Sequence, residues 1–266
     1  MASAIGDWGF LNRLNRIIQT KSGHCVMLAI DHGYFGNIPG QLKQFSCLEP
    51  LYEYADAIML TRGMLRSCVP SNIDKPIILR VSAGASMLKE LSNEEINVTI
   101  NEAIRLNVSA LTCSIFIGGE HEKESLLNLS KLVNWGQEYG IPTLAVTAVG
   151  REMVRDARYL GMASRMAAEM GATMVKTYYC EDFEQVTGIV PVPVVIAGGK
   201  KIPERDALEM SKNAIDKGAV GVDMGRNIFQ SDSPIGMIQA VRAIVHEDAT
   251  VDEAYEIYKG GPKGLL

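Results

Sequence analysis

Residues 26–31, with the sequence VMLAID, are the first of eight short apolar stretches, rich in β-branched residues, that recur along the chain. The other seven are residues 57–61 (AIMLT), 76–81 (PIILRV), 110–117 (ALTCSIFI), 143–147 (TLAVT), 173–178 (TMVKTY), 192–197 (VPVVIA) and 219–224 (AVGVDM). Nearly continuous apolar runs of this length predict parallel strands whose two faces are both covered by helices.

Amphipathic segments with helix end signals lie between these strands. Residues 92–95 (SNEE) have the pattern of a capping box and precede Ile96, Ile100 and Ile104 at helical spacing. The other expected helices span residues 122–139, 151–170, 203–217, 234–246 and 250–258. Glycine follows the first three of these segments, and a second capping box (residues 250–253, TVDE) begins the last.

Eight strand–helix alternations predict an α/β fold, a (β/α)₈ barrel formed by residues 1–266 as a single domain. Residues 7–18 would form an extra helix before the first strand, positioned to plug the bottom of the barrel. The alternative is a doubly wound open sheet, which usually has fewer strands and an early glycine-rich turn. The first strand here leads into Asp31, His32 and Gly33 without a GxGxxG pattern, which favours the barrel.

The composition excludes several functional classes. The 266 residues include 26 lysines and arginines against 31 aspartates and glutamates, a net charge of −5, and 47% are hydrophobic. This is a globular profile, and the pI of ≈ 5.5 argues against a nucleic-acid partner. No apolar stretch approaches the roughly 20 residues of a membrane helix, and no secretory signal is recognisable. We therefore expect a cytoplasmic protein that does not bind membranes.

The cysteines predict free thiols. They are few, odd in number and widely spaced, and none forms a CxxC pair, which argues against both a disulfide scaffold and a zinc site. Their positions are Cys25, Cys47, Cys68, Cys113 and Cys180.

One lysine lies inside an otherwise apolar strand. Lys176 interrupts residues 174–179 (MVKTYY), and a buried lysine is costly unless it is paired or functional. A desolvated lysine, or one near other cations, has a lowered pKa, and its neutral amine attacks carbonyl groups to form a Schiff base. Two interpretations remain open: a Schiff-base nucleophile, or a lysine that reaches solvent or pairs with a carboxylate.

Two glycine–cation combinations follow the last two predicted strands. They are Gly198-Gly199-Lys200 and Gly225-Arg226. Barrels often bind phosphate with the loops after strands seven and eight. Glycine lets the backbone approach the anion closely, and lysine or arginine adds positive charge. Together these residues predict a binding site for a phosphorylated small molecule.

Other polar residues also end predicted strands, where barrel enzymes carry their sites. Asp31 is a candidate for moving protons or orienting a substrate hydroxyl, or else for capping the loop or forming an ion pair with Lys176 or Arg62. Arg80 is either a second anion contact or the partner of Asp31.

Two weaker candidates for substrate contacts are His32 and Thr147. Asp223 lies inside the last strand, and we expect it to form an ion pair within the barrel. Nothing in the sequence has the spacing of a metal site, so we predict that no metal is bound.

Four segments resemble those of a known family: residues 26–35 (VMLAIDHGYF), 175–179 (VKTYY), 193–201 (PVVIAGGKK) and 221–230 (GVDMGRNIFQ). They are similar to the class I aldolase family that includes deoxyribose-phosphate aldolase and archaeal-type fructose-bisphosphate aldolase. The resemblance extends from residues 7–9 to the last helix. It implies a (β/α)₈ barrel that assembles into a homo-oligomer, a decamer of two stacked rings of five. It also implies that Lys176 forms the Schiff base, that Asp31 is the strand-one aspartate and that the two glycine loops bind phosphate.

One departure separates two branches of that family. The fructose-bisphosphate aldolases end strand five in Tyr-Pro-Arg-Gly, and the tyrosine is the acid/base of aldol chemistry. Here residues 147–150 are TAVG, and threonine is a very poor proton donor beside tyrosine. This agrees with a thiolase branch of the family.

Membership of the thiolase branch implies a particular reaction. Lys176 would form an iminium with a phosphorylated hydroxy-dione, and coenzyme A would take an acetyl group, which gives acetyl-CoA and dihydroxyacetone phosphate. Coenzyme A is then a co-substrate, and neither a metal nor a prosthetic group is required.

Two other functions remain open from the sequence. An aldolase or a transaldolase-like synthase acting on a sugar phosphate would use the same lysine, although that branch keeps the strand-five tyrosine. A phosphate-binding barrel without catalysis, serving as a sensor or scaffold, predicts loss of the nucleophile, whereas Lys176 is present.

Overall fold

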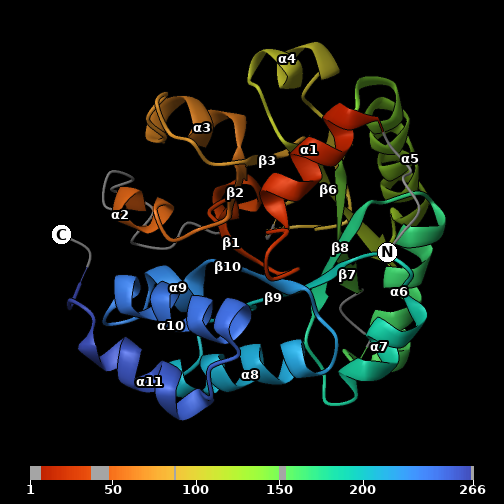
Figure 1. Cartoon of the computed structure of the whole chain (residues 1–266). Coiled ribbons are helices and arrows are strands. Elements are labelled where there is room, and N and C mark those ends of the chain that lie inside the picture. The colour runs from red at the N-terminus through yellow and green to blue at the C-terminus, as the bar shows by residue number, and fades with distance from the viewer. Residues whose placement is uncertain (1–6, 37–47, 87, 150–153, 265–266) are drawn as a thin grey trace.

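The computed structural model describes residues 7–36, 48–86, 88–149 and 154–264, and within them eight parallel strands close into a barrel (Figure 1). Around the barrel the order is β1 (Cys25–Ala29), β10 (Gly221–Met224), β9 (Val194–Ala197), β8 (Met174–Tyr178), β7 (Thr143–Val149), β6 (Ala110–Ile117), β3 (Ile77–Arg80) and β2 (Ala57–Thr61), which pairs again with β1. The predicted (β/α)₈ barrel is confirmed, and the open sheet is not what forms.

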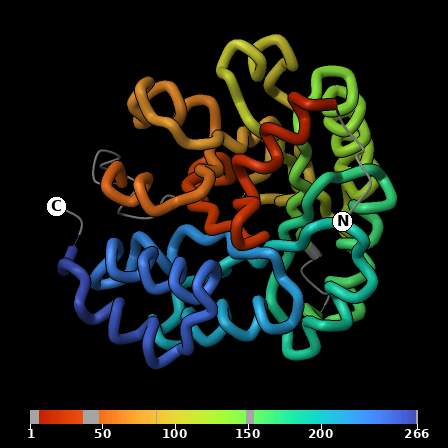
Figure 2. Tube along the Cα trace, in the orientation of Figure 1, coloured from red at the N-terminus to blue at the C-terminus, as the bar shows by residue number. Residues whose placement is uncertain are grey.

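Helices surround the barrel and bury the outward face of its strands. They are α2 (Glu49–Tyr52), α3 (Arg62–Cys68), α4 (Ile100–Arg105), α5 (Glu122–Tyr139), α6 (Ala157–Glu169), α7 (Phe183–Ile189), α8 (Glu204–Asp216), α9 (Arg226–Phe229), α10 (Pro234–Glu247) and α11 (Val251–Gly260). Figure 2 shows the last segments of the chain, in blue, lying together, and α11 packs against α10 and α8. The predicted capping box of α11 forms between Thr250 and Glu253.

An extra helix, α1 (Trp8–Ile17), precedes the first strand and lies across one end of the barrel (Figure 1). Asp7 begins it by accepting a hydrogen bond from the Phe10 backbone N–H at 2.9 Å. Ile17 is fully buried and packs with barrel residues such as Met27 and Met59. The prediction of an N-terminal helix that closes the barrel is therefore confirmed.

The helix predicted from residues 92–95 does not begin there. Instead β4 (Ser82–Ala83) pairs antiparallel with β5 (Glu95–Ile96), and α4 begins only after Thr99. Glu94 is buried because its carboxylate accepts hydrogen bonds from the hydroxyls of Ser82 and Tyr34. A tertiary partner has thus overridden a local capping pattern.

Three properties of the described ranges bear on function. No helix in them is long and apolar enough to span a bilayer, and no cluster of three or more potential metal ligands occurs there. Four cysteines are free: Cys25, Cys68, Cys113 and Cys180. Cys47 lies outside the described residues.

Candidate active site

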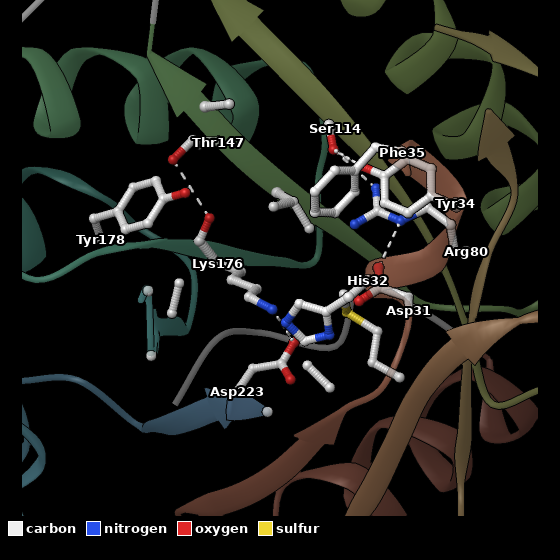
Figure 3. A pocket seen from close by; sticks show the side chains of 18 of the residues that line it. Asp31, His32, Tyr34, Phe35, Arg80, Ser114, Thr147, Lys176, Tyr178 and Asp223 are labelled. Atoms are coloured by element: carbon white, nitrogen blue, oxygen red, sulfur yellow. Dashed lines mark hydrogen bonds and ion pairs between the residues drawn. The ribbon is translucent and has the colours of Figure 1, made fainter. Parts of the chain in front are cut away.

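A pocket of ≈ 370 Å³ opens at the carboxyl ends of the barrel strands, and we call it the Lys176 pocket (Figure 3). It brings together every residue that the sequence singled out for the site: Asp31, His32, Arg80, Thr147, Lys176, Gly198, Gly199, Lys200, Gly225 and Arg226. Residues nearly 200 positions apart meet here because parallel strands all deliver their last residues to the same end of the barrel.

Lys176 is held against a buried carboxylate. Its Nζ lies 2.9 Å from Asp223 Oδ2, and the two side chains are only 9% and 0% exposed. Figure 3 shows the two side chains pointing toward each other from β8 and β10. Burial raises the pKa of Asp223 above its ordinary value, although the charge of Lys176 acts in the opposite direction. The predicted ion pair of Asp223 is confirmed, and its partner is the candidate nucleophile.

Arg80 pairs with Asp31 across the mouth of the barrel. Arg80 Nε donates a hydrogen bond to Asp31 Oδ2 at 3.0 Å, and the side chains are 3% and 8% exposed. A second donor, Arg80 Nη1, bonds Ser114 Oγ at 2.9 Å. Burial raises the pKa of Asp31, but the charges of Arg80 and Lys176 more than offset it, so the pKa lies below its usual range. Asp31 is therefore ionised at neutral pH, and of the two roles open for Arg80 the structure shows the partner of Asp31.

Tyr34 and Glu94 also line the pocket, and the sequence did not single them out for the site. The Tyr34 hydroxyl donates to Glu94 Oε1 at 2.9 Å and lies 3.3 Å from Ser114 Oγ. The Arg80 guanidinium stands 4.7 Å from the centre of the Tyr34 ring. Burial raises the pKa of both Tyr34 and Glu94. The only sequence signal for Tyr34 was its place in the segment VMLAIDHGYF. Glu94 was not expected in the site because residues 92–95 were interpreted as a helix cap.

His32 faces the pocket as a neutral imidazole. Burial lowers its pKa to about 4, and the charges of Lys176 and Arg226 act in the same direction. Its Nδ1 is buried and has no hydrogen-bond partner among the residues that the structure describes. The ring meets Phe229 edge-on at 5.7 Å between centroids. A neutral ring with an unpartnered nitrogen can accept a hydrogen bond, or relay a proton from one nitrogen to the other without holding a positive charge.

Each of the two glycine loops has a position that requires glycine. Gly199 has a φ of 67°, which an L side chain rarely adopts. A Cβ at Gly225 would lie 2.2 Å from the carbonyl oxygen of Ala29, so only glycine fits there. Asn227 fastens the first loop to the second, since its Nδ2 donates to the Gly198 carbonyl at 2.6 Å. The loops are thereby held side by side.

Beside these loops, Arg226 carries a positive charge that the described part of the chain leaves uncompensated. Its Nε is buried without a hydrogen-bond partner there, and burial lowers the pKa of the guanidinium. A half-buried guanidinium next to two glycine turns can donate charge-assisted hydrogen bonds to a phosphate.

Arg155 adds a further cation to the same side of the pocket. Its guanidinium stacks on the Tyr178 ring at 3.8 Å. The expected helix 151–170 placed Arg155 inside a helix, whereas α6 begins at Ala157 because Asp156 caps it by accepting from the Tyr159 N–H. Residues 151–153 of that expected helix lie outside the described ranges.

Thr147 lines the pocket, but its hydroxyl is already engaged. It donates to Thr177 Oγ1 at 2.8 Å, and it also contacts the Lys176 carbonyl at 3.4 Å (Figure 3). The residue of β7 that is in register with Lys176 is Val146. The Thr147 side chain therefore stabilises the contact between β7 and β8.

The chain is similar in sequence to a known aldolase family and to proteins of two bacteria. Residues 25–231 match the sequence model of the family described as DeoC/LacD family aldolase. A 3-hydroxy-5-phosphonooxypentane-2,4-dione thiolase of Escherichia coli is 53% identical over 254 residues, which cover 95% of this chain and 87% of the relative. An uncharacterized aldolase of Pasteurella multocida is 53% identical over the same length, covering 95% and 88%.

Solved structures agree on the fold. An archaeal fructose 1,6-bisphosphate aldolase superposes with a TM-score of 0.79 at 23% identity, covering 90% of this chain and 99% of that chain. A fructose-bisphosphate aldolase from Slackia heliotrinireducens gives 0.83 at 18% identity, covering 95% and 90%. At these identities the likeness concerns the barrel itself.

Proposed function

The chain belongs to the DeoC/LacD aldolase family, and on that premise we propose that it is a Schiff-base enzyme that cleaves 3-hydroxy-5-phosphonooxypentane-2,4-dione. Coenzyme A is the proposed acyl acceptor, and the products are acetyl-CoA and dihydroxyacetone phosphate, a step in autoinducer-2 degradation. The observation that carries the proposal is Lys176, a buried amine paired with Asp223 in a pocket that also contains Arg226, whose buried Nε has no hydrogen-bond partner among the described residues.

The charges in the pocket orient the proposed substrate. Its phosphate is held by Arg226 and the backbone of Gly199 and Gly225, with Lys200 beside them. The C4 carbonyl is the ketone nearest to the phosphate, so this anchoring presents C4 to Lys176. The pocket volume of ≈ 370 Å³ suits a ligand of this small size.

Asp223 prepares Lys176 for attack. An ammonium ion is not a nucleophile, so its proton has to leave before the nitrogen adds to C4. The Asp223 carboxylate is 2.9 Å away and, through burial, more basic than usual. In the proposed mechanism it takes this proton and returns it when the carbinolamine loses water to form the iminium.

The iminium on Lys176 then accepts the electron pair of the C2–C3 bond as that bond breaks. When bound, coenzyme A supplies the thiol whose sulfur forms the thioester bond with C2. As the C2–C3 bond breaks, its electron pair moves to the iminium nitrogen and leaves an enamine on Lys176. C3 is then protonated, and water releases dihydroxyacetone phosphate and the free lysine.

Two residues serve this step in the proposal. Asp31 is ionised, so its carboxylate accepts a hydrogen bond from the C3 hydroxyl and orients C3. His32 is neutral and has an unsatisfied ring nitrogen, so it relays the proton lost by the thiol to C3: one ring nitrogen accepts that proton while the other gives up its own. Strand β7 contributes Val146, Thr147 and Ala148 to the pocket. None of these has the acidic phenol that aldol cleavage in the tyrosine branch uses, which favours thiolysis.

Borohydride trapping tests the proposal. The protein is incubated with the phosphorylated dione, reduced and digested, and the adduct is located by mass spectrometry. We expect the adduct on Lys176, and we expect Lys176→Arg to abolish both the adduct and the formation of acetyl-CoA. The exposed Lys123 serves as the control through Lys123→Arg, which should retain both. An adduct on another lysine, or cleavage that proceeds without coenzyme A, would show that the assignment is wrong.

A further inference from the structure

A second cavity, of ≈ 570 Å³, adjoins the Lys176 pocket. The linings of the two spaces have Asp31, Tyr34 and Arg80 in common, so these three side chains form a shared wall. We call the second space the α3 cavity because α3 supplies much of its lining. That lining includes Thr61, Arg62, Gly63, Met64, Ser82 and Asn97.

We propose that the α3 cavity binds the acyl acceptor and guides its thiol past the shared wall to the substrate carbon beyond Lys176. The ligand class is a coenzyme A-type thiol, with a long amide-containing arm that ends in phosphates. This inference rests on the proposed thiolysis and adds to it the route by which the thiol enters.

The strand order places the α3 cavity and the glycine loop after β9 on opposite sides of the barrel. In the closed order, β3 stands four strands away from β9, which is directly across, and β2 stands directly across from β8. The glycine loop that anchors the donor phosphate follows β9, whereas the α3 cavity lies beyond the ends of β2 and β3. A donor anchored by its phosphate therefore extends its acetyl end, C1 and C2, toward the α3 cavity. An acceptor that enters there meets C2 without crossing the phosphate loops.

The lining matches the chemistry of such an arm. Met64, Val98 and Ala83 present apolar surface for methylene groups. Ser67 and Asn97 add a hydroxyl and an amide that can pair with the amides of the ligand. A cavity that is mainly apolar with a few polar groups is typical of cofactor sites.

Positive charge for the phosphates comes from Arg62, which lines the α3 cavity, and from Arg66, which lies outside the lining and one turn further along α3. Arg62 and Arg66 on α3 share one carboxylate, since they bind the two oxygens of Glu102 at 2.9 and 2.6 Å. Two cations against one anion leave a net positive charge, and the arginine side chains are 39% and 52% exposed. Exposed guanidinium groups at a cavity mouth attract and bind phosphate groups.

Gly63 offers a way to block the α3 cavity without disturbing the fold. It lies in α3, and a Cβ built on it meets no atom within 4 Å. Gly63→Phe therefore places a ring in open space at the cavity. The matched control is Gly188→Phe, because Gly188 also lies in a helix, α7, has equal space and lines neither cavity.

The test measures acceptor binding and turnover separately. Isothermal titration calorimetry with coenzyme A should give a Kd raised at least about tenfold by Gly63→Phe and unchanged by Gly188→Phe. In steady state, Gly63→Phe should raise KM for coenzyme A by a similar factor, with KM for the phosphorylated dione within about twofold of wild type. Arg66→Gln should weaken coenzyme A binding and reduce its dependence on salt.

The outcomes separate this inference from the proposed function. If wild type makes acetyl-CoA and Gly63→Phe binds coenzyme A with unchanged affinity, the α3 cavity is not the acceptor site and the thiolase assignment stands. If wild type binds coenzyme A and Gly63→Phe does not, but no acetyl-CoA forms, the binding site is supported and the proposed reaction is wrong. If wild type does not bind coenzyme A, the inference is overturned.

Discussion

Replacing Arg80 by methionine is expected to destabilise the protein by about 3–5 kcal/mol at pH 7. Arg80 and Asp31 form an ion pair that is almost completely buried, with a contact of 3.0 Å. Removing one partner leaves the other charge desolvated and unpaired, and this penalty exceeds the loss of an ordinary hydrogen bond. Methionine keeps most of the length of the side chain, so little of the effect comes from an empty cavity.

The assay is urea unfolding followed by circular dichroism, with a double-mutant cycle. Arg80→Met with Asp31→Leu removes both charges, so the double variant should be more stable than the sum of the two single losses predicts, by at least about 2 kcal/mol. The control is Arg165→Met, since Arg165 pairs with Glu169 on the surface. Its loss should stay within about 1 kcal/mol.

The pH dependence supplies an independent check. In wild type the pKa of Asp31 lies below its unfolded value of about 3.9. The contribution of Asp31 to the free energy of unfolding is therefore fully present at a pH above the unfolded-state pKa. It is lost as the pH falls through the pKa that Asp31 has in the folded protein. Without Arg80 the main cause of the lowering is gone and burial raises the pKa. The ionised carboxylate then opposes folding at pH 7, and protonation relieves this, so the penalty of Arg80→Met should shrink from pH 7 to pH 4. A penalty under about 1 kcal/mol, or one that is additive with Asp31→Leu and independent of pH, would refute this reasoning.

Three more outcomes are expected. Asp223→Asn should slow formation of the borohydride-reducible adduct on Lys176 by about a hundredfold or more, because the amide cannot take the ammonium proton; rapid-quench mass spectrometry measures this, and unchanged trapping would exclude that role. Arg226→Gln should raise KM for the phosphorylated substrate by about 10- to 100-fold, the equivalent of one charge-assisted hydrogen bond, while KM for an analogue without phosphate stays the same; an equal effect on both ligands would place the phosphate elsewhere. The pKa of His32 is about 4 in the folded protein and about 6.5 in the unfolded chain, so its contribution to the free energy of unfolding is fully present above about pH 6.5 and falls by about 3 kcal/mol toward pH 4. Urea titrations of His32→Asn should lack this decrease, and a decrease that survives the substitution would contradict a neutral buried ring.

The barrel could be predicted because its strands have apolar residues on both faces. Residues 57–61 and 110–117 form strands with the predicted bounds, and residues 122–139 form the predicted helix. In each case local composition and tertiary burial agree, since the interior of the barrel and the surrounding helices both require apolar contacts. The helix predicted from residues 92–95 does not form there, because the local pattern and the tertiary contacts disagree. The Glu94 carboxylate could have capped a helix locally. Instead it accepts hydrogen bonds from Ser82 and Tyr34, which lie 12 and 60 positions away along the chain.

The site was only partly accessible to the same reasoning. Lys176 and the glycine loops could be found because a charge inside an apolar strand, and glycines after the last two strands, contradict what packing alone would select. Tyr34 lies in a short 3-10 helix (His32–Phe35) and Arg155 lies in a loop, and neither residue carries such a contradiction. Their roles depend on ring contacts with Arg80 and Tyr178 that only the folded chain creates.

Under the proposed function, the balance of charge inside the Lys176 pocket favours one orientation of the substrate. Lys176 is neutralised by Asp223 and Arg80 by Asp31, so those two cations have little attraction left for an anion. Arg226 has no such partner among the described residues, and its buried Nε lacks a hydrogen bond. A phosphate placed at the Arg80 end would face the Asp31 carboxylate, whereas at the glycine loops it would meet the Arg226 guanidinium. Under the proposed function we therefore expect one orientation, with the phosphate at the loops and the carbonyl two bonds from its ester oxygen at Lys176. In that orientation the C4 ketone is the one that would become the iminium.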